Sequence, residues 1–591
     1  MLEMSTKIKQ KSWMIILIAI FIFSFILDLY VLTRYNLSYG RDGPFYDLQV
    51  LSILQTGFPA SNDPPLVYYL LTPFVMLSGN SFIGIKIGMA LMGSLMAFPA
   101  YFLTEIFSEK LKVESKIPAL LSAFLITINP FYFSMIGDFM QNLVGVFFLL
   151  LLVYFAVKWF ENTKEWKKYG ILTVILIICS IFTHIYTGIL AVVLFVSLLL
   201  FSMIFRTYKT GKIPGRDLKI VGIVGVLIIG GLVALFALYP VAFSKFTTVL
   251  SFVNNSSSTT SNLIGGPSTS PLIFLTVPFI LGILATLNVL YKGLKEKIDA
   301  QNEGINQKTL LVLVYLVMTV VIIAISTFPS IDSQYQSRFI MLAFVPIALM
   351  VPLGLKLIEK WISNRYPSKK GLKWGIVSII AVLFMLSSFY SASATFSSLQ
   401  PSITIDQYND LVKIKAEISN GTIKSNGIIV VNDYHTGYWV QYVTGMHVET
   451  GNSTSEIQAK YPNQTIYALT LTENQQSGLK NSFESSWNPL FPYSFPLFGL
   501  NITSNQNGPG NQNAPGNMPD QISRNNMTVP PSGGLGNKQF NRSSSTPPNF
   551  GNMTQNMNTG SSMPNQSSNQ LITSSGKLIY SSNNLKIYKI S

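Results

Sequence analysis

The sequence is poor in charged residues and has almost no cysteine. Asp, Glu, Lys and Arg make up only 11% of its 591 residues, whereas 49% are apolar and the mean hydropathy is +0.39. These proportions exclude an ordinary soluble protein and place most of the chain in a lipid bilayer. The one cysteine, Cys179, lies within an apolar run, so no disulfide can form within the chain.

Several common catalytic signatures are also missing. The sequence has no P-loop, GxGxxG, CxxC or HExxH pattern, so nothing in it indicates nucleotide-driven chemistry. Basic residues exceed acidic ones and give a net charge of +15. That excess is explained by anchoring charges in the loops between membrane spans, and it does not indicate nucleic-acid binding.

Long apolar runs predict eleven membrane spans. A hydrocarbon core needs roughly 20 apolar residues per helix. Thr183, His184 and Tyr186 divide the long run between 170 and 205. The segment 65–78 is too short to span and is interpreted as a re-entrant or interfacial helix. The predicted spans are 13–33, 82–106, 117–136, 140–160, 170–184, 186–205, 220–242, 272–291, 309–328, 339–358 and 375–396.

Clusters of lysine and arginine set the predicted orientation. They precede the first span, follow the second and recur at every second loop, which places them on the cytoplasmic side. We therefore expect a multi-pass plasma membrane protein whose N-terminus is cytoplasmic and whose residues after 397 are outside. N-x-S/T sequons from Asn36 to Asn565 all fall in predicted exterior segments.

The chain after 397 has the composition of a soluble domain. Helical periodicity alternates with short apolar runs, and the C-terminal end has the pattern of a hairpin. These features predict a small exterior α/β domain, with the fold class as a whole being a polytopic α-helical membrane protein of about eleven spans. The predicted elements are helices at 406–419 and 435–445, strands at 427–433 and 465–471, and a hairpin at 577–590.

Domain boundaries follow from the composition. Residues 1–396 are expected to form the membrane domain, and 397–484 plus 571–591 the exterior domain. The tract 485–570 is rich in Asn, Gly, Pro and Ser. It cannot bury enough apolar surface to offset its ordering entropy, so a disordered insertion is predicted.

The first exterior loop, 34–81, carries an unusual acidic residue. Asp42 lies in GRDGPFY, directly after the first span and before a half-apolar, helix-like segment. A carboxylate at the membrane surface beside an amphipathic helix is costly, which indicates chemistry at the lipid–water boundary. The alternative is a helix N-cap. Asp47 and Asp63 lie in the same loop and remain candidates.

A second acidic candidate is Asp138, at the predicted outer end of the third span. The topology puts Asp42 and Asp138 on the same exterior face, although Asp138 can also be a cap of the fourth span. Two carboxylates there could hold a divalent cation such as Mn²⁺ or Mg²⁺, or one of them could act as a general base.

Three other side chains lie at the predicted outer boundary. His184, next to Tyr186, interrupts an apolar run, and a structural hydrogen-bonding role is the alternative there. Arg338 lies at the outer end of the tenth span, where topogenic charges are avoided, and suits a forked contact to phosphate. Lys245 could do the same, or could simply extend toward the interface.

Several of these motifs together resemble the GT-C superfamily of membrane glycosyltransferases. The superfamily includes protein O-mannosyltransferases, lipid A aminoarabinose transferases and the catalytic subunits of oligosaccharyltransferases. The resemblance covers roughly residues 13–400 in topology, and the motifs that carry it are short. They are RDGPFY at 41–46, DPPLVYYLL at 63–71, Gly137-Asp138, His184 and Arg338-Phe339.

The resemblance implies roles for individual residues. Asp42 would be the catalytic base or a metal ligand, Asp138 the second acid and Arg338 a contact of the donor phosphate. Lys245 would assist Arg338. The auxiliary residues would be His184, Tyr46 and Asp63. By this resemblance the chain would transfer a sugar, with inversion, from a polyprenyl-phosphate-linked donor to an exterior protein or lipid acceptor.

Two departures from the family patterns limit this inference. Asp42 is followed by Gly43 where mannosyltransferase-like sequences often have an Asp-Glu pair. The oligosaccharyltransferase signature WWDYG is absent, and NDYHTGYW at 432–439 is only distantly similar to it.

The competing hypotheses are a transporter or flippase of lipid-linked solutes, and a surface-anchored binding protein. A transporter should place paired charges or broken helices near the bilayer midplane.

Overall fold

The computed structural model describes most of the membrane region and much of the C-terminal domain. The described residues are 2–61, 63–109, 116–161, 165–213, 215–238, 273–295, 317–321, 341–367, 370–450, 454–471 and 576–590. The predicted disordered tract, Lys245 and Arg338 lie outside them, as does most of the predicted span 309–328.

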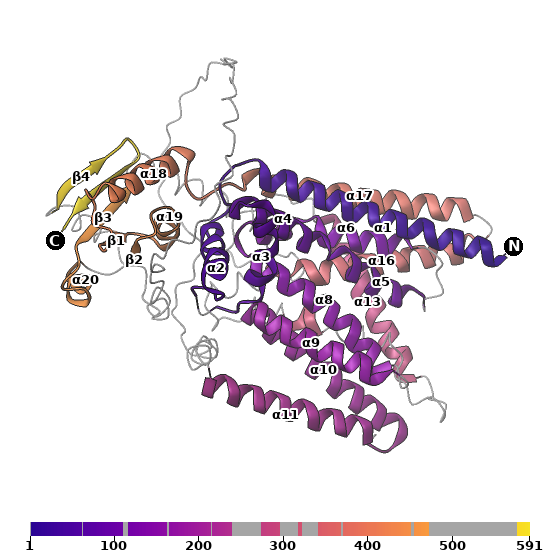
Figure 1. The fold of residues 1–591 in the computed structure, drawn as a ribbon. Coiled ribbons are helices and arrows are strands. Elements are labelled where there is room, and N and C mark those ends of the chain that lie inside the picture. The colour runs from indigo at the N-terminus through magenta and orange to yellow at the C-terminus, as the bar shows by residue number, and fades with distance from the viewer. Residues whose placement is uncertain are drawn as a thin grey trace, which may run out of the picture. The chain divides into compact units, whose positions relative to one another are not determined.

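The described part of the chain before residue 400 is helical (Figure 1). Its helices are α1 (Leu2–Thr33), α2 (Gly43–Thr56), α3 (Leu66–Ser78), α4 (Ser81–Ser94), α5 (Ala97–Glu109), α6 (Ile117–Thr127), α7 (Pro130–Asp138), α8 (Met140–Glu161), α9 (Trp166–Thr183), α10 (Ile185–Thr210), α11 (Gly215–Leu238), α13 (Ile273–Lys295), α16 (Phe344–Arg365) and α17 (Lys370–Ser398).

Several of these helices are suited to cross a bilayer. Among the described residues, six stretches are long and apolar enough to do so, and the bent pair α6–α7 would make a seventh. The predicted class, a polytopic helical membrane protein, is therefore confirmed. The predicted number of eleven spans stays a prediction. Helices α11, α13 and α16 correspond to three further predicted spans but are not among these stretches, and most of 309–328 lies outside the described residues. The apolar stretches are 12–33, 81–106, 140–160, 166–183, 185–204 and 371–398.

The predicted span 117–136 contains a bend. Helices α6 and α7 meet at an angle of 40°. Asn129 has an extended backbone, and its side chain accepts the N–H of Tyr132 at 2.9 Å, so a new helix begins there. Pro130 follows at the first helical position, where its missing N–H costs nothing. The sequence INP thus ends one helix and starts the next, which carries Asp138 at its last residue.

A second interruption agrees with the sequence. His184 has an extended backbone (φ −162°, ψ 138°) between α9 and α10, where the apolar run was predicted to divide. The short apolar helix α3, with 13 residues, occupies the segment predicted to be too short to span. Its interfacial position remains a prediction.

The C-terminal domain contains a five-stranded sheet in the order β2-β1-β3-β5-β4. Strand β1 is parallel to β2 and β3, whereas β5 is antiparallel to β3 and β4. The sequence analysis missed the short strand β2 and helix α20. The elements are α18 (Ile405–Ser419), β1 (Ile428–Val431), α19 (Tyr434–Thr444), β2 (His447–Thr450), α20 (Thr454–Lys460), β3 (Ile466–Leu471), β4 (Lys577–Ser581) and β5 (Leu585–Lys589).

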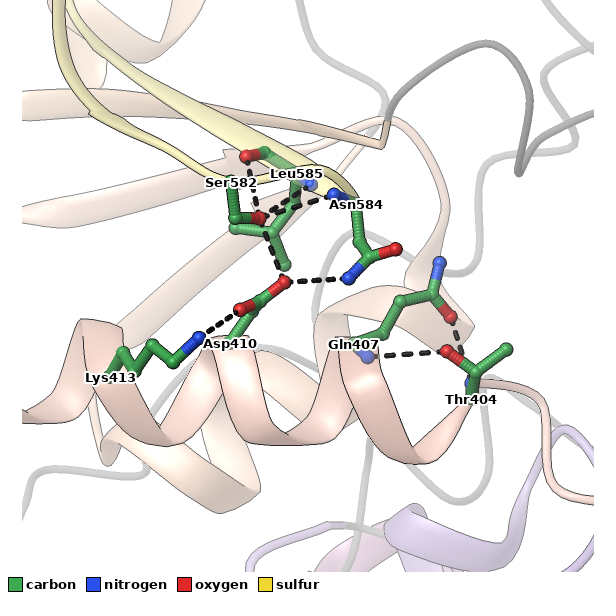
Figure 2. A network of polar contacts seen from close by, with 7 residues as sticks. All are labelled: Thr404, Gln407, Asp410, Lys413, Ser582, Asn584 and Leu585. Atoms are coloured by element: carbon green, nitrogen blue, oxygen red, sulfur yellow. Dashed lines mark hydrogen bonds and ion pairs between the residues drawn. The ribbon is translucent and has the colours of Figure 1, made fainter.

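Polar contacts attach the C-terminal hairpin to α18 (Figure 2). The Asp410 carboxylate accepts hydrogen bonds from Ser582 Oγ and Asn584 Nδ2, both at 2.8 Å. It also accepts one from Lys413 Nζ at 2.9 Å. A capping box formed by Thr404 and Gln407 starts the same helix. Side-chain hydrogen bonds thus hold the hairpin to α18, and pairing of β5 with β3 holds it to the rest of the sheet.

The core of the C-terminal domain includes residues from the first loop and from α4 of the membrane region. Trp439 on α19 is fully buried, and its indole N–H donates to Ser402 Oγ at 2.8 Å. Leu37 and Phe82 belong to the same apolar cluster, and Phe82 lies 6.0 Å from Trp439 between ring centroids. This shared packing brings α19 against α2 (Figure 1).

Candidate active site

Asp42 stands at the start of α2 but does not cap it. The residue occupies the N-cap position with a helical backbone (φ −90°, ψ −3°), and its side chain makes no cap hydrogen bond. The carboxylate is 35% exposed, and its Oδ1 lies 3.6 Å from His435 Nδ1. Asp42 therefore occupies the N-cap position, but its carboxylate does not cap the helix by accepting a backbone N–H.

The loop before Asp42 is fixed on two sides. The backbone N–H of Arg41 donates to Asp138 Oδ1 at 2.6 Å, and that of Gly40 donates to the Gln400 carbonyl at 3.2 Å. Gly40 has a left-handed backbone (φ +69°), and a Cβ there would overlap Asp138 Oδ1. Only glycine meets both requirements. Asp138 therefore supports the loop that presents Asp42, whereas the exterior position of the two carboxylates stays a prediction.

Tyr46 lies close enough to three carboxylates for their charges to act on its hydroxyl. Burial is the main cause that raises the pKa of Tyr46, and the nearby Asp42 carboxylate raises it further. Asp63 and Asp138 act in the same direction. The Tyr46 hydroxyl accepts the backbone N–H of Gln141 at 3.2 Å. The predicted residues Asp42, Asp63, Asp138 and Tyr46 are thus brought together.

Gln141, on α8, was not singled out from the sequence. Its side-chain Nε2 donates to the Tyr68 hydroxyl at 2.8 Å and to the Pro64 carbonyl at 3.1 Å. It connects the start of α8 with Pro64, in the DPPLVYYLL stretch, and with Tyr68 of α3. A glutamine one residue inside a predicted span is a weak signal, because only the tertiary structure reveals what it faces.

His435 is the main residue that the sequence analysis missed. It lies in NDYHTGYW, which the sequence analysis considered only as a distant relative of WWDYG. Asp433 caps α19 by accepting the backbone N–H groups of His435 and Thr436 at 3.0 and 3.1 Å. The capped first turn holds the His435 ring, whose side chain is 15% exposed, beside Asp42.

The His435 ring is neutral by virtue of its surroundings. Burial lowers its pKa below the ordinary value, and the charge of Asp433 only partly opposes this. A hydrogen bond with the Arg41 backbone also acts on the ring, whereas Nδ1 is buried and has no hydrogen-bond partner. The contact of His435 with Asp42 is accordingly not an ion pair near pH 7.

Aromatic packing fixes α19 on α2. The rings of Phe45 and Tyr438 have centroids 5.0 Å apart, and Phe45 also lies 6.1 Å from Tyr68. Tyr434 packs on His435 at 3.8 Å and lies 5.9 Å from Tyr438. Such pairs add roughly 0.5–1.5 kcal/mol each beyond their buried area. The geometry between Asp42 and His435 is therefore set by a packed interface.

Asp47 has a different environment from Asp42. It is fully buried and its Oδ2 accepts a hydrogen bond from the Ser38 hydroxyl. Burial raises the pKa of Asp47 to about 7, although hydrogen bonds from Ser38 and Ser81 oppose the shift. This carboxyl connects the loop to α4, which makes it a structural group and a weaker catalytic candidate.

The remaining predicted residues are placed elsewhere or lie outside the described chain. His184 packs against Tyr186, with ring centroids 4.9 Å apart, at the break between α9 and α10. Arg338 and Lys245 are not among the described residues. Within the described ranges, no three His, Cys, Asp or Glu side chains are grouped so that they could hold a metal ion.

Comparisons with known proteins bear on what this arrangement does. Residues 62–229 match the family described as dolichyl-phosphate-mannose-protein mannosyltransferase. No curated protein matches the chain significantly. The apo oligosaccharyltransferase of Archaeoglobus fulgidus is similar in structure with a TM-score of 0.53. Its identity is 12%, over 77% of this chain and 69% of that one.

A further solved structure is apo ArnT of Cupriavidus metallidurans. It aligns with 80% of this chain and 95% of its own, at 11% identity and a TM-score of 0.40. The family match and the fold shared with the oligosaccharyltransferase agree with the resemblance seen in the sequence. The family match covers residues 62–229, and the likeness to the oligosaccharyltransferase is one of fold.

Proposed function

We propose that this protein transfers a sugar from a polyprenyl-phosphate-linked donor to a hydroxyl group of an exterior protein or lipid acceptor. The observation that carries the proposal is the Asp42 carboxylate, which does not cap its helix and faces the junction of α2 and α19. The matched family is named for a dolichyl-phosphate-mannose donor and a protein acceptor, which supports the lipid-linked donor.

In the proposed reaction Asp42 accepts the proton of the acceptor hydroxyl. The oxygen then forms a bond to the anomeric carbon as the bond from that carbon to the phosphate oxygen breaks. The electron pair leaves with the lipid phosphate, and attack from the opposite side inverts the configuration. Because lipid phosphate is already a good leaving group, positioning and charge stabilisation suffice.

Asp138 and Tyr46 support this chemistry by holding the loop. Asp138 accepts the Arg41 N–H, and the charges of the three carboxylates act on Tyr46. Arg338 and Lys245 remain the proposed contacts of the donor phosphate. The site and the C-terminal domain would then lie outside the plasma membrane, with the N-terminus in the cytoplasm.

A divalent cation also remains a proposal. Asp42 and Asp138 offer the oxygen ligands that Mg²⁺ and Mn²⁺ prefer, and such ions are often held by one or two carboxylates together with substrate phosphate. A bound ion would neutralise charge on the leaving phosphate. The proton transfer to Asp42 does not depend on it.

The test is release of free polyprenyl phosphate from purified full-length protein. Short-chain polyprenyl-phosphate-linked mannose and other sugars are supplied with a serine-containing peptide, with and without Mn²⁺ or Mg²⁺. Release that is lost in Asp42→Asn, while the variant remains folded, supports the proposal. Absence of release across the sugars, or equal release from the variant, contradicts it and favours the transporter hypothesis.

A further inference from the structure

One carboxyl group of this chain is buried within a membrane helix. Asp28 lies in the apolar stretch 12–33 of α1, and it is 0% exposed. An ionisable side chain inside a membrane span is costly, and where one occurs it is a candidate for a functional role, with its hydrogen-bond partner as the first residue to examine. Nothing in the reaction at Asp42 accounts for Asp28.

The partner of Asp28 is Tyr132. The Tyr132 hydroxyl donates to Asp28 Oδ2 at 2.5 Å, and Tyr132 is also fully buried. Asp28 Oδ1 has no hydrogen-bond partner among the described residues. Because the described chain holds the carboxyl group by this one bond, the purpose of Asp28 lies in what the bond keeps in place.

The bond lies at the start of α7. The backbone N–H of Tyr132 donates to Asn129 Oδ1 at 2.9 Å, where the chain turns from α6 into α7. A Cβ at Gly93 on α4 would overlap the Tyr132 hydroxyl, so α4 closely approaches this group. The tyrosine therefore joins α7 to α1 in the first turn after the bend, with α4 packed against it.

The bend is the reason why α7 needs this attachment. Helices α6 and α7 meet at 40°, and Pro130 lacks the N–H that would continue the helical hydrogen bonds across the break. A half-helix beyond such a break is not held in line by its own backbone. Its direction is set by packing and by side-chain bonds to its neighbours.

The other end of α7 reaches the loop before α2. Asp138, the last residue of α7, accepts the Arg41 N–H at 2.6 Å. The same loop is attached to α1, because the Tyr39 hydroxyl donates to the Val31 carbonyl at 2.6 Å. The contacts thus form a ring that runs from α1 through the loop and α7 back to α1, and the buried bond between α7 and α1 closes it.

We propose that Asp28 and Tyr132 are positioning residues for the sugar transfer. Their bond fixes the direction of α7, and α7 holds the loop that presents Asp42. The inference rests on the proposed function and extends it to two residues of the membrane helices, neither of which takes part in the chemistry itself. Loss of the bond lets α7 turn at the bend, so that Asp138 moves away from the Arg41 N–H and the base is displaced.

Hydrogen exchange tests this without catalysis. In full-length Asp28→Leu in lipid nanodiscs, the Arg41 amide should exchange about tenfold faster than in wild type, because its acceptor has moved. Asp28→Asn keeps an oxygen that accepts from Tyr132 and should stay within about threefold of wild type. Tyr132→Phe removes only the hydroxyl and should reproduce the acceleration even if Asp28→Leu does not fold. An unchanged Arg41 amide in Tyr132→Phe overturns the inference.

Glu359→Gln is the matched control. Glu359 is another buried carboxylate of the helical region, 1% exposed, and lies 3.8 Å from Lys356 and 3.9 Å from Lys373. It belongs to α16 and not to the ring of contacts. The variant should leave exchange of the Arg41 amide unchanged. If it accelerates exchange as much as Tyr132→Phe does, the helices have loosened in general and the inference is wrong.

Transfer kinetics connect the bond to the reaction. In Tyr132→Phe, kcat should fall about tenfold, while KM for short-chain polyprenyl-phosphate mannose stays within about twofold of wild type. Gly40→Ala displaces the same loop directly, so the double variant should lose much less than the product of the two separate losses. A loss equal to that product contradicts the inference. If wild type transfers no sugar, the proposed function fails, and the exchange of the Arg41 amide alone decides whether the bond positions the loop.

Discussion

Asp410 and Asp42 both lie near the start of a helix, and their surroundings differ. Asp410 accepts hydrogen bonds from Ser582, Asn584 and Lys413 at 2.8–2.9 Å. Burial raises its pKa, but these hydrogen bonds outweigh burial and leave the pKa below its ordinary value. The Asp42 side chain makes no cap hydrogen bond to its helix, and its Oδ1 lies 3.6 Å from His435 Nδ1.

The difference separates a structural carboxylate from a functional one. A charge that is surrounded by its own donors stabilises the fold and has little capacity left for a substrate. A carboxylate that is partly exposed and does not cap its helix can be reached by a substrate hydroxyl. Substitutions at the two positions should therefore affect different properties.

The largest effect is expected at Asp42. Asp42→Asn keeps the size of the side chain but removes the base, so transfer should fall by about a thousandfold, within the range for loss of a general base. The thermal midpoint should hardly change. Initial rates and a melting curve on the same preparation check both parts. A variant that loses stability instead of activity would make Asp42 equivalent to Asp410.

At Asp410 the opposite is expected. Asp410→Ala removes the acceptor of three donors and should lower the free energy of unfolding by about 2–4 kcal/mol, while activity per folded molecule is kept. Amide hydrogen exchange of residues 582–585 in the full-length protein should rise. Lys413→Ala, which removes one exposed donor, should have a much smaller effect; equal effects would contradict the importance of the buried bonds to the hairpin.

The stability of the hairpin should depend on pH in a direction set by the lowered pKa of Asp410. Because the folded-state pKa of Asp410 is below its ordinary value, its stabilisation is present above about pH 4 and is lost as pH falls through the lower folded-state pKa. Hydrogen exchange of the hairpin should therefore accelerate on strong acidification in wild type and not further in Asp410→Ala.

Gly40 tests whether the loop must hold Asp42 in place. Gly40→Ala would place a methyl group over Asp138 Oδ1 and the Gly137 carbonyl, and we expect transfer to fall about tenfold as the loop moves. Gly79→Ala is the control. It has a similar backbone (φ +66°) with nothing within 4 Å of its Cβ, so it carries the strain without the clash. Similar rates in both variants would make loop position unimportant.

Asp47 is a third case, in which burial and not hydrogen bonding decides the pKa of the carboxyl. Burial raises its pKa to about 7, so the folded state holds a proton that the unfolded chain releases near pH 4. Stability should therefore decrease as pH rises from about 4 to 7, by at most about 1.4 kcal/mol per pH unit. In Asp47→Asn the thermal midpoint should change less with pH over this range. A slope that persists in the variant assigns it to another group.

Much of the fold followed from local patterns. Apolar runs of sufficient length predicted membrane helices, and the interruption at His184 was visible because a polar residue breaks a run. The bend at Asn129 was missed, although INP contains its cause, because length alone was considered. Strand β2 was missed because four residues with only two buried side chains give too short a pattern.

The sequence by itself determined that the chain crosses a membrane, that an α/β domain follows, and that Asp42 is the acidic residue to examine. Hydrophobic periodicity is local, so it can be read without knowing contacts. Only the tertiary structure decided that His435, in a helix far along the chain, lies beside Asp42. That contact depends on long-range packing of α19 against α2 through Phe45, Tyr438 and Trp439, for which no local pattern exists.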